Sequence, residues 1–205
     1  MAQINFPQFL RRYGIKMLIT STPDIVPGTI IERRRKGYFK YGHLREVLGG
    51  DDKSWRYRLQ PANFIYGSVE RSLSLASRTR LNEFGVIIGG GLNRARSVRF
   101  DLQNVQARIL TNRSKLSLIP ELFAFRRDNR RAWNKTLNDK WVADYTYYAT
   151  EVRFTFEAEG GVDLEADIAD ELVVSGSALV EWKNKKSFVV ANTAEVPFGF
   201  SGWKL

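Results

Sequence analysis

Residues 145–158, YTYYATEVRFTFEA, alternate with a period of two for longer than the five to six residues of an average strand. One face would carry mostly apolar and aromatic side chains, namely Thr146, Tyr148, Thr150, Val152, Phe154 and Phe156. The other face would carry Tyr147, Glu151, Arg153, Thr155 and Glu157, and we expect Tyr147 and Ala149 to be exposed in a soluble monomer. The pattern predicts one long strand. Its length suits either an oblique crossing of a sandwich or a bilayer crossing, which takes roughly nine to eleven tilted residues.

A second alternating stretch follows after a turn signal at Gly160 and Gly161. In residues 162–169, VDLEADIA, apolar residues alternate with acidic ones. The two stretches therefore predict one long antiparallel hairpin, 145–158 with 162–169, whose second arm is acidic on its outer face. A surface hairpin of a β-rich domain explains the same pattern.

Composition favours one globular domain over residues 1–205. The chain is 43% apolar and 13% aromatic, which excludes a disordered protein. It has no cysteine, no apolar run near 18 residues, no charged-then-apolar leader, and Ala2 rather than glycine after Met1. We expect a soluble, cytoplasmic protein without lipid anchor or transmembrane helix. With no cysteine and a single His43, no metal or cofactor is expected.

The formal net charge of +10 favours a polyanionic partner. This partner would be nucleic acid or an anionic membrane surface, and the charge does not choose between them.

Two basic segments with aromatic residues stand near the N-terminus. INFPQFLRRYGI, residues 4–15, predicts a short amphipathic helix after Pro7 with Arg11 and Arg12 on its outer side, and KMLIT predicts a short strand after it. In TIIERRRKGYFKY, residues 29–41, five cations surround Tyr38, Phe39 and Tyr41. This segment suits a solvated hairpin tip, a lipid headgroup site, or a site for single-stranded nucleic acid.

The rest of the chain predicts strands around one helical segment. HLREVLGG, residues 43–50, predicts a short helix ended by glycine. Residues 54–77 and 98–110 predict two β arms, with a bulge or bend at Gln103 and Asn104. Residues 114–141 are helical in character, with Glu121 to Phe125 following Pro120 and a basic later half. Residues 178–182 and 188–190 predict strands around the basic turn KNKK.

Motifs of catalysis are missing from the sequence. It has no nucleophile elbow, no paired-histidine metal motif and no kinase signature. The carboxylates between Glu151 and Glu171 stand at alternate strand positions, which is typical of surface charge. We therefore expect no enzyme.

Taken in order, these elements resemble the pore-forming N-terminal domain of the gasdermin family, in particular bacterial or fungal gasdermin-like proteins. The resemblance is carried by INFPQFLRRYGI, RRRKGYFKY, HLREVL, GSVERSLSL before a glycine-rich segment, and the terminal SGSALVEWKNKKSFVVANTAEVPFGFSGWKL. It covers nearly the whole chain. It implies an α+β fold, β-rich with long antiparallel amphipathic hairpins and a few short helices, able to refold into a transmembrane β-barrel.

The resemblance also implies a function. Such a protein would be a cell-death effector of innate immunity that binds anionic phospholipid membranes, assembles into a homo-oligomeric ring and permeabilises the inner face of the plasma membrane. An activating protease or partner protein is implied, and nucleic acid is not expected as a partner. Animal members of the family carry a large C-terminal inhibitory domain, which we do not expect in this chain because it ends soon after its last predicted strand. It would be either a processed or truncated fragment or a member held inactive in another way. The chain also has no cysteine for the family's acylation.

The residues that would act follow from the same resemblance. The lipid contacts would be Arg11, Arg12, Arg33, Arg34, Arg35, Lys36 and Lys40, with Tyr38 and Phe39 as interfacial anchors. The inserting hairpins would be residues 64–110 and 145–190. Their membrane-inserting side chains would be Ile65, Val69, Leu73, Val98, Phe100, Tyr148, Val152, Phe154, Phe156, Val180 and Trp182.

Two other functions fit the residues. A basic β-rich module would bind nucleic acid with RRRKGYFKY and the Arg126 to Arg131 cluster on phosphates and aromatic rings on bases. An interaction protein would assemble head to tail through its basic segment at 126–140 and its acidic segment at 151–171.

Overall fold

The fold was analysed in a computed structural model. The structure describes residues 6–19, 24–35, 37–49, 56–62, 68–70, 86–88, 97–158, 163, 172–174, 178–185, 187–192 and 196–205. These residues form antiparallel β-sheets with a few helices, which confirms the α+β, β-rich class predicted from the sequence.

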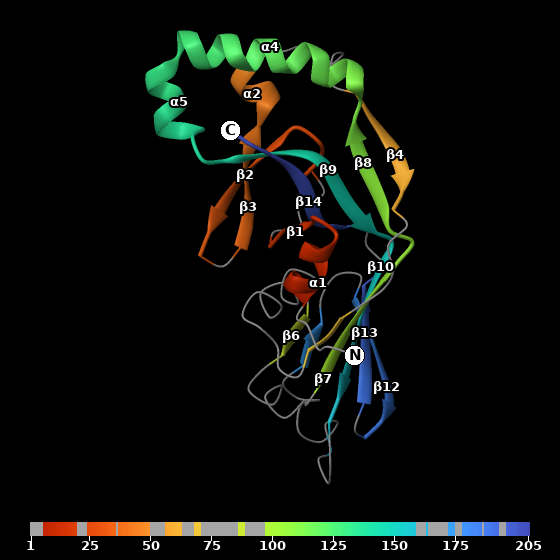
Figure 1. The fold of residues 1–205 in the computed structure, drawn as a ribbon. Helices are drawn as coiled ribbons and strands as arrows, with labels where there is room; N and C mark the ends of the chain where they lie inside the picture. Colours follow the sequence, from red (N-terminus) through yellow and green to blue (C-terminus); the bar gives the residue numbers. More distant parts are fainter. Residues whose placement is uncertain are drawn as a thin grey trace.

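The larger sheet occupies the upper half of Figure 1 and has seven strands within the described ranges. Along the path β1-β14-β9-β2-β3, β9 also pairs with β8, and β8 pairs with β4. The bounds are β1 (Lys16–Met17), β2 (Thr29–Arg34), β3 (Gly37–His43), β4 (Tyr57–Pro61), β8 (Gln106–Leu110), β9 (Trp141–Ala149) and β14 (Val196–Lys204). The sequence did not predict β14, which covers one whole edge of β9.

The second sheet lies below the first, and its described strands are ordered β12-β13-β10-β7-β5. Their bounds are β5 (Ser68–Glu70), β7 (Ser97–Gln103), β10 (Glu151–Glu157), β12 (Ala178–Asn184) and β13 (Ser187–Asn192). A separate pair joins β6 (Val86–Ile88) to β11 (Leu172–Val174). The predicted strands on either side of KNKK are confirmed as the hairpin β12–β13.

Helices cover the larger sheet and the junction between the sheets. The helix α1 (Phe6–Arg12) lies between the two sheets, and α2 (Leu44–Leu48), α4 (Asn112–Asp128) and α5 (Arg130–Thr136) cover the upper end (Figure 1). The predicted short helices α1 and α2 are confirmed, and α2 ends at Gly49 with φ 66°. The helical character predicted for residues 114–141 is confirmed by α4 and α5, although α4 already begins at Asn112 under a Thr111 cap and contains Pro120.

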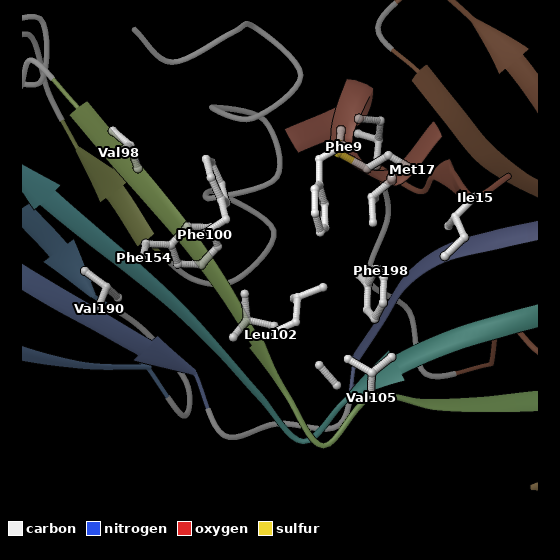
Figure 2. Packing of buried hydrophobic residues seen from close by; sticks show 14 of the residues in the cluster. Phe9, Ile15, Met17, Val98, Phe100, Leu102, Val105, Phe154, Val190 and Phe198 are labelled. Atoms are coloured by element: carbon white, nitrogen blue, oxygen red, sulfur yellow. The ribbon is translucent and has the colours of Figure 1, made fainter. Parts of the chain in front are cut away.

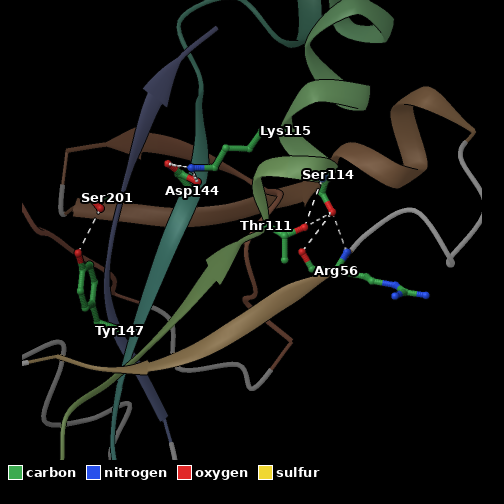
Figure 3. A network of polar contacts seen from close by, with 7 residues as sticks. All are labelled: Arg56, Thr111, Ser114, Lys115, Asp144, Tyr147 and Ser201. Atoms are coloured by element: carbon green, nitrogen blue, oxygen red, sulfur yellow. Dashed lines mark hydrogen bonds and ion pairs between the residues drawn. The ribbon is translucent and has the colours of Figure 1, made fainter.

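The start of α4 is fixed to the larger sheet by polar contacts (Figure 3). Lys115 Nζ lies 2.7 Å from the Asp144 carboxylate of β9. Ser114 Oγ accepts a 3.0 Å hydrogen bond from the Arg56 backbone N–H and donates one of 3.2 Å to the Arg56 carbonyl. These bonds tie α4 to both β9 and the segment before β4.

The largest apolar cluster lies where α1 meets the two sheets. Phe9 and Met17 from the α1–β1 segment, Phe100 of β7 and Phe198 of β14 belong to it (Figure 2). The rings of Phe100 and Phe154 meet edge to face, with centroids 5.1 Å apart. Thus the segment that carries the first basic residues is held by the same core that holds the lower sheet.

The prediction of one strand over residues 145–158 was wrong. Of its predicted inner face, Thr146, Tyr148, Val152, Phe154 and Phe156 are buried, whereas Thr150 is exposed. The stretch is divided by a bend at Thr150 into the end of β9 in the larger sheet and β10 in the second sheet. Tyr148 and Val152 on either side of the bend are both buried. Because the alternation stays in phase across Thr150, the sequence pattern does not reveal the bend.

The predicted hairpin of 145–158 with 162–169 was also wrong. Both edges of β10 are occupied, one by β7 and the other by β13. Alternation in the sequence of 162–169 does not indicate which strand would pair with it, and apart from Asp163 this predicted arm lies outside the described residues.

Tyr147 and Ala149 are not exposed as expected, because β9 is an inner strand of the larger sheet. Ala149 is fully buried. Tyr147 is half-buried, and its hydroxyl forms a hydrogen bond of 3.3 Å with Ser201 Oγ (Figure 3).

Candidate functional site

A groove of about 220 Å³ lies between α1, β1 and the tip of the β2–β3 hairpin. Its walls, as far as the described residues form them, carry five cations and no carboxylate. The lining residues are Pro7, Arg11, Lys16, Met17, Arg33, Arg34, Arg35, Gly37 and Tyr38. The sequence-predicted basic helix and basic hairpin therefore come together at one place.

Local folding explains why the cations face outward here. In α1, Phe9 and Leu10 are buried, so that the next residues, Arg11 and Arg12, are left on the outer side. In β2, Ile30 and Ile31 are buried, whereas the strand end and turn from Arg33 to Arg35 project beyond the core. The apolar residues of both segments thus anchor them and leave the guanidinium groups at the surface.

Gly37 brings the hairpin tip against the segment after β1. Its φ is +149°, and a Cβ at this position would lie 2.3 Å from Ile19 Cγ1. Only glycine allows this approach without displacing Ile19. The Ile19 backbone N–H donates a 2.9 Å hydrogen bond to the Tyr38 carbonyl, which fixes the hairpin beside α1 and β1.

The cations of the groove differ in whether a carboxylate neutralises their charge. Arg34 Nε donates a 2.7 Å hydrogen bond to Glu32, and its guanidinium lies 5.3 Å from the Phe39 ring. The bonds from Arg34 and Lys140 hold the pKa of Glu32 below its ordinary value. Among the described residues, Arg11, Arg33 and Arg35 have no carboxylate partner, so their charge is available to a ligand.

Lys16 is a groove residue that sequence reasoning missed. Its Nζ lies 3.9 Å from the centroid of the Trp141 ring, and burial lowers its pKa. The alternation of β1 was a usable signal, because Met17 is buried and Lys16 must therefore point the other way.

Of the other predicted lipid contacts and anchors, Tyr38 lines the groove, whereas Arg12, Phe39 and Lys40 do not. Arg12 is exposed but does not line the groove, and Lys40 forms an ion pair with Asp24. Phe39 packs against the main core, and the Tyr38 ring meets Phe200 edge to face with centroids 5.3 Å apart. Lys36 lies outside the described residues.

The predicted inserting residues gather on the inner face of the lower sheet. Val98, Phe100, Val152, Phe154 and Phe156 are buried in the main cluster, and Val180 and Trp182 pack against it (Figure 2). Tyr148 is buried in the larger sheet. Val69 is placed only by its backbone pairing with Arg99, and Ile65 and Leu73 lie outside the described residues.

The outer face of the lower sheet is charged. Arg99 and Arg153 are exposed there, and Arg153 forms an ion pair with Glu151. Burial raises the pKa of Asp101 against the opposing effect of Arg99 and Arg153. The sheet therefore has one apolar and one charged face, as the alternation predicted.

The strand pair β7–β10 continues into β8–β9 without a shift of register. Gln103 lies opposite Glu151 below the bend, and Gln106 lies opposite Tyr148 above it. On each side of the ribbon, two residues separate one pair from the next. The four strands therefore form one ribbon in a single register, bent where Asn104 has a φ of +48°. The bend predicted at Gln103 and Asn104 is confirmed.

Metal and membrane-helix sites are not found in the described part of the chain. No cluster of three His, Cys, Asp or Glu side chains there could hold a metal ion. No helix within those residues has both the length and the apolar character needed to cross a bilayer.

Comparisons with known proteins found a similarity at the level of structure. No family model and no curated protein matches the sequence. A bacterial gasdermin from Bradyrhizobium tropiciagri is a similar solved structure, with a TM-score of 0.44 and 15% sequence identity over 93% of this chain and 82% of that chain.

Proposed function

We propose that this protein is a non-enzymatic, gasdermin-like pore-forming cell-death effector that binds anionic lipid headgroups in the groove between α1 and the β2–β3 tip. The observation that carries the proposal is the gathering of Arg11, Lys16 and Arg33 to Arg35 around one groove without a lining carboxylate. It binds at the inner face of the plasma membrane, assembles there into a ring and permeabilises the bilayer.

Headgroup phosphates fit the chemistry of this groove. Guanidinium groups bind phosphate oxygens through paired, charge-assisted hydrogen bonds. Each cation near an anionic bilayer contributes about 1 kcal/mol, and salt screens this attraction. The cations without a carboxylate partner, Arg11, Arg33, Arg35 and Lys16, supply most of this attraction.

The bent ribbon supports the insertion step of the proposal. Its arms run over residues 97–110 and 141–157, and both exceed the roughly nine to eleven residues that a tilted strand needs to cross a bilayer. If the bend straightened, the register would already be correct, and Phe100 and Phe154 would pass from the core to lipid. The charged outer face of β7 and β10 would turn away from lipid.

Single-stranded nucleic acid is the alternative that the sequence left open. Binding of this kind uses open aromatic faces on which bases stack. Tyr38 and Phe39 are half-buried, and their rings are engaged by Phe200 and by the Arg34 guanidinium. These contacts favour the lipid over the nucleic acid.

Vesicle sedimentation and dye release test the proposal with a pair of matched variants. Arg33→Glu/Arg35→Glu should abolish sedimentation with phosphatidylserine-containing vesicles and dye release from them, whereas Arg113→Glu/Arg131→Glu, exposed on α4 and α5, should retain both. Vesicles of phosphatidylcholine alone should remain intact with every protein.

Three results would contradict the proposal. They are equal dye release from neutral vesicles, retained binding by Arg33→Glu/Arg35→Glu, and tight, Arg33-dependent binding of a single-stranded RNA oligonucleotide in an anisotropy titration.

A further inference from the structure

A second groove, of about 230 Å³, lies at the upper end of the molecule among α4, α5 and the end of β14. Aromatic and aliphatic side chains make up most of its walls. The lining residues are Ile119, Leu122, Phe123, Arg126, Trp133, Trp203, Lys204 and Leu205. None of these residues belongs to the groove at the hairpin tip.

An exposed apolar stripe on α4 leads along this groove. Leu116, Ile119 and Phe123 stand three and four residues apart and are 75%, 43% and 65% exposed. The same helix buries Leu118 on its other side, so the stripe is additional to what α4 needs for packing. A helix with a second, exposed apolar stripe is typical of an interaction surface.

Charge surrounds the apolar stripe. Residues 112–136 contain seven basic and two acidic residues, a net charge of +5. The Arg126 guanidinium lies 5.3 Å from the Trp133 ring on the wall of the groove and has no carboxylate partner among the described residues. Lys204, by contrast, forms an ion pair with Asp139. Of the two cations that line this groove, Arg126 is therefore the one whose charge can bind an acidic ligand.

Trp133 supplies a second polar group. Its side chain is 2% exposed, and its Nε1–H has no hydrogen-bond acceptor within the described parts of the chain. An unpaired buried donor is unfavourable. A ligand that binds this wall therefore meets the Trp133 ring beside the Arg126 charge.

We propose that this groove docks an acidic segment of a partner protein, which inserts an apolar side chain between Phe123 and Trp203 and places a carboxylate on Arg126. A hollow of side-chain size suits a peptide anchor better than a flat bilayer does. The elements that line the groove, α4, α5 and the end of β14, lie at the α2 end of β3, opposite the hairpin tip (Figure 1). A membrane that contacts the tip leaves this surface free for a protein.

Selection from a random dodecapeptide display library tests the proposal. The full chain serves as bait, and the Arg126→Glu variant serves for counter-selection. The enriched peptides should combine Asp or Glu with Leu, Phe or Trp. Enrichment of basic peptides, or of no shared pattern, overturns the proposal.

Anisotropy titration of the best enriched peptide, carrying fluorescein, supplies the quantitative test. Arg126→Glu and Phe123→Asp should each weaken binding about tenfold. The control variants Arg113→Glu on α4 and Leu179→Asp on β12, both exposed and outside the groove and its stripe, should change it about twofold at most. Equal losses in groove and control variants overturn the proposal, because they show unspecific attraction.

Two further measurements test whether a membrane or a second copy of the chain, rather than a partner protein, occupies the groove. If Phe123→Asp reduces vesicle sedimentation as much as Arg33→Glu/Arg35→Glu does, the groove is a membrane contact and the proposal fails. If analytical ultracentrifugation finds a dimer that Phe123→Asp dissociates, a second copy occupies the groove and the proposal likewise fails. A monomer with unchanged vesicle binding and weakened peptide binding supports it.

Discussion

Asn104 Nδ2 donates a hydrogen bond of 3.2 Å to Thr150 Oγ1 across the bend that separates the two sheets. The Thr150 backbone N–H donates a second bond, also of 3.2 Å, to the Gln103 carbonyl. Asn104 has a left-handed backbone, with φ at +48°. The two bends therefore face each other and are joined by both side-chain and main-chain hydrogen bonds.

Replacing Asn104 with valine should destabilise the bent form. A β-branched residue in the left-handed region costs roughly 1–2 kcal/mol, and the bond to Thr150 is lost as well. For a chain of this size each kcal/mol lowers the melting temperature by about 2–4 °C. Asn104→Val should therefore melt at lower temperature and, if the ribbon straightens, release dye faster from anionic vesicles.

Asn104→Gly is the control for this prediction, because glycine accepts the same backbone while losing the side-chain bond. It should change the rate of dye release less than Asn104→Val does. A valine variant that melts lower but releases dye no faster would argue against straightening at this bend.

Lys16→Met should weaken binding to phosphatidylserine-containing vesicles about fivefold, the equivalent of about 1 kcal/mol for one cation. The free energy of unfolding should change little, because two effects oppose each other. The variant loses the cation–π contact with Trp141, and it also loses the cost of holding a partly buried charge. Lys16→Arg keeps the charge and should retain binding. Vesicle sedimentation measures the effect, and equal binding of wild type and Lys16→Met would remove Lys16 from the site.

His43 should make stability fall as the pH drops below its ordinary pKa. Its Nδ1 accepts a bond from the Arg45 backbone N–H, its Nε2 lies 3.3 Å from the Pro27 carbonyl, and burial lowers its pKa. The unfolded chain takes up the proton near pH 6.5, whereas the folded protein takes it up only at lower pH. The stabilisation is thus present above pH 6.5 and is lost on acidification, by at most about 1.4 kcal/mol per pH unit.

His43→Asn isolates this effect, since asparagine caps a helix without titrating. Thermal unfolding at pH 7 and pH 5 should show a smaller loss for the variant than for the wild type. The charged neighbours of His43 are present in both proteins, namely Arg45, Glu46 and Lys40. Their own contribution to the pH dependence of stability therefore cancels in the comparison. Equal losses in the two proteins would show that His43 does not contribute.

Phe154→Ala should destabilise the folded protein by about 3–5 kcal/mol, because it leaves a cavity beside Phe100 in the main core. Arg153→Ala on the neighbouring outer position should cost about 1 kcal/mol or less, since its ion pair with Glu151 is at the surface. Urea unfolding of both variants measures the difference. Similar losses would contradict the assignment of an apolar inner and a charged outer face.

The sequence by itself determined the faces of the strands and the positions of several elements. Period-two alternation placed Val152, Phe154 and Phe156 inside, because a strand side chain can only point to one face or the other. Local signals placed α1, α2 and the tip of the β2–β3 hairpin, since caps, glycines and apolar spacing act over a few residues.

Tertiary structure alone decided which strands pair and where the long stretch bends. Alternation fixes a face but carries no information about the neighbouring strand, so β10 pairs with β7 and β13 rather than with residues 162–169. The bend at Thr150 depends on Asn104, 46 residues away, and leaves the phase of the pattern unchanged. The groove likewise forms only when α1, β1 and the hairpin tip meet over a shared core, and this long-range packing is what brings Lys16 beside the predicted arginines.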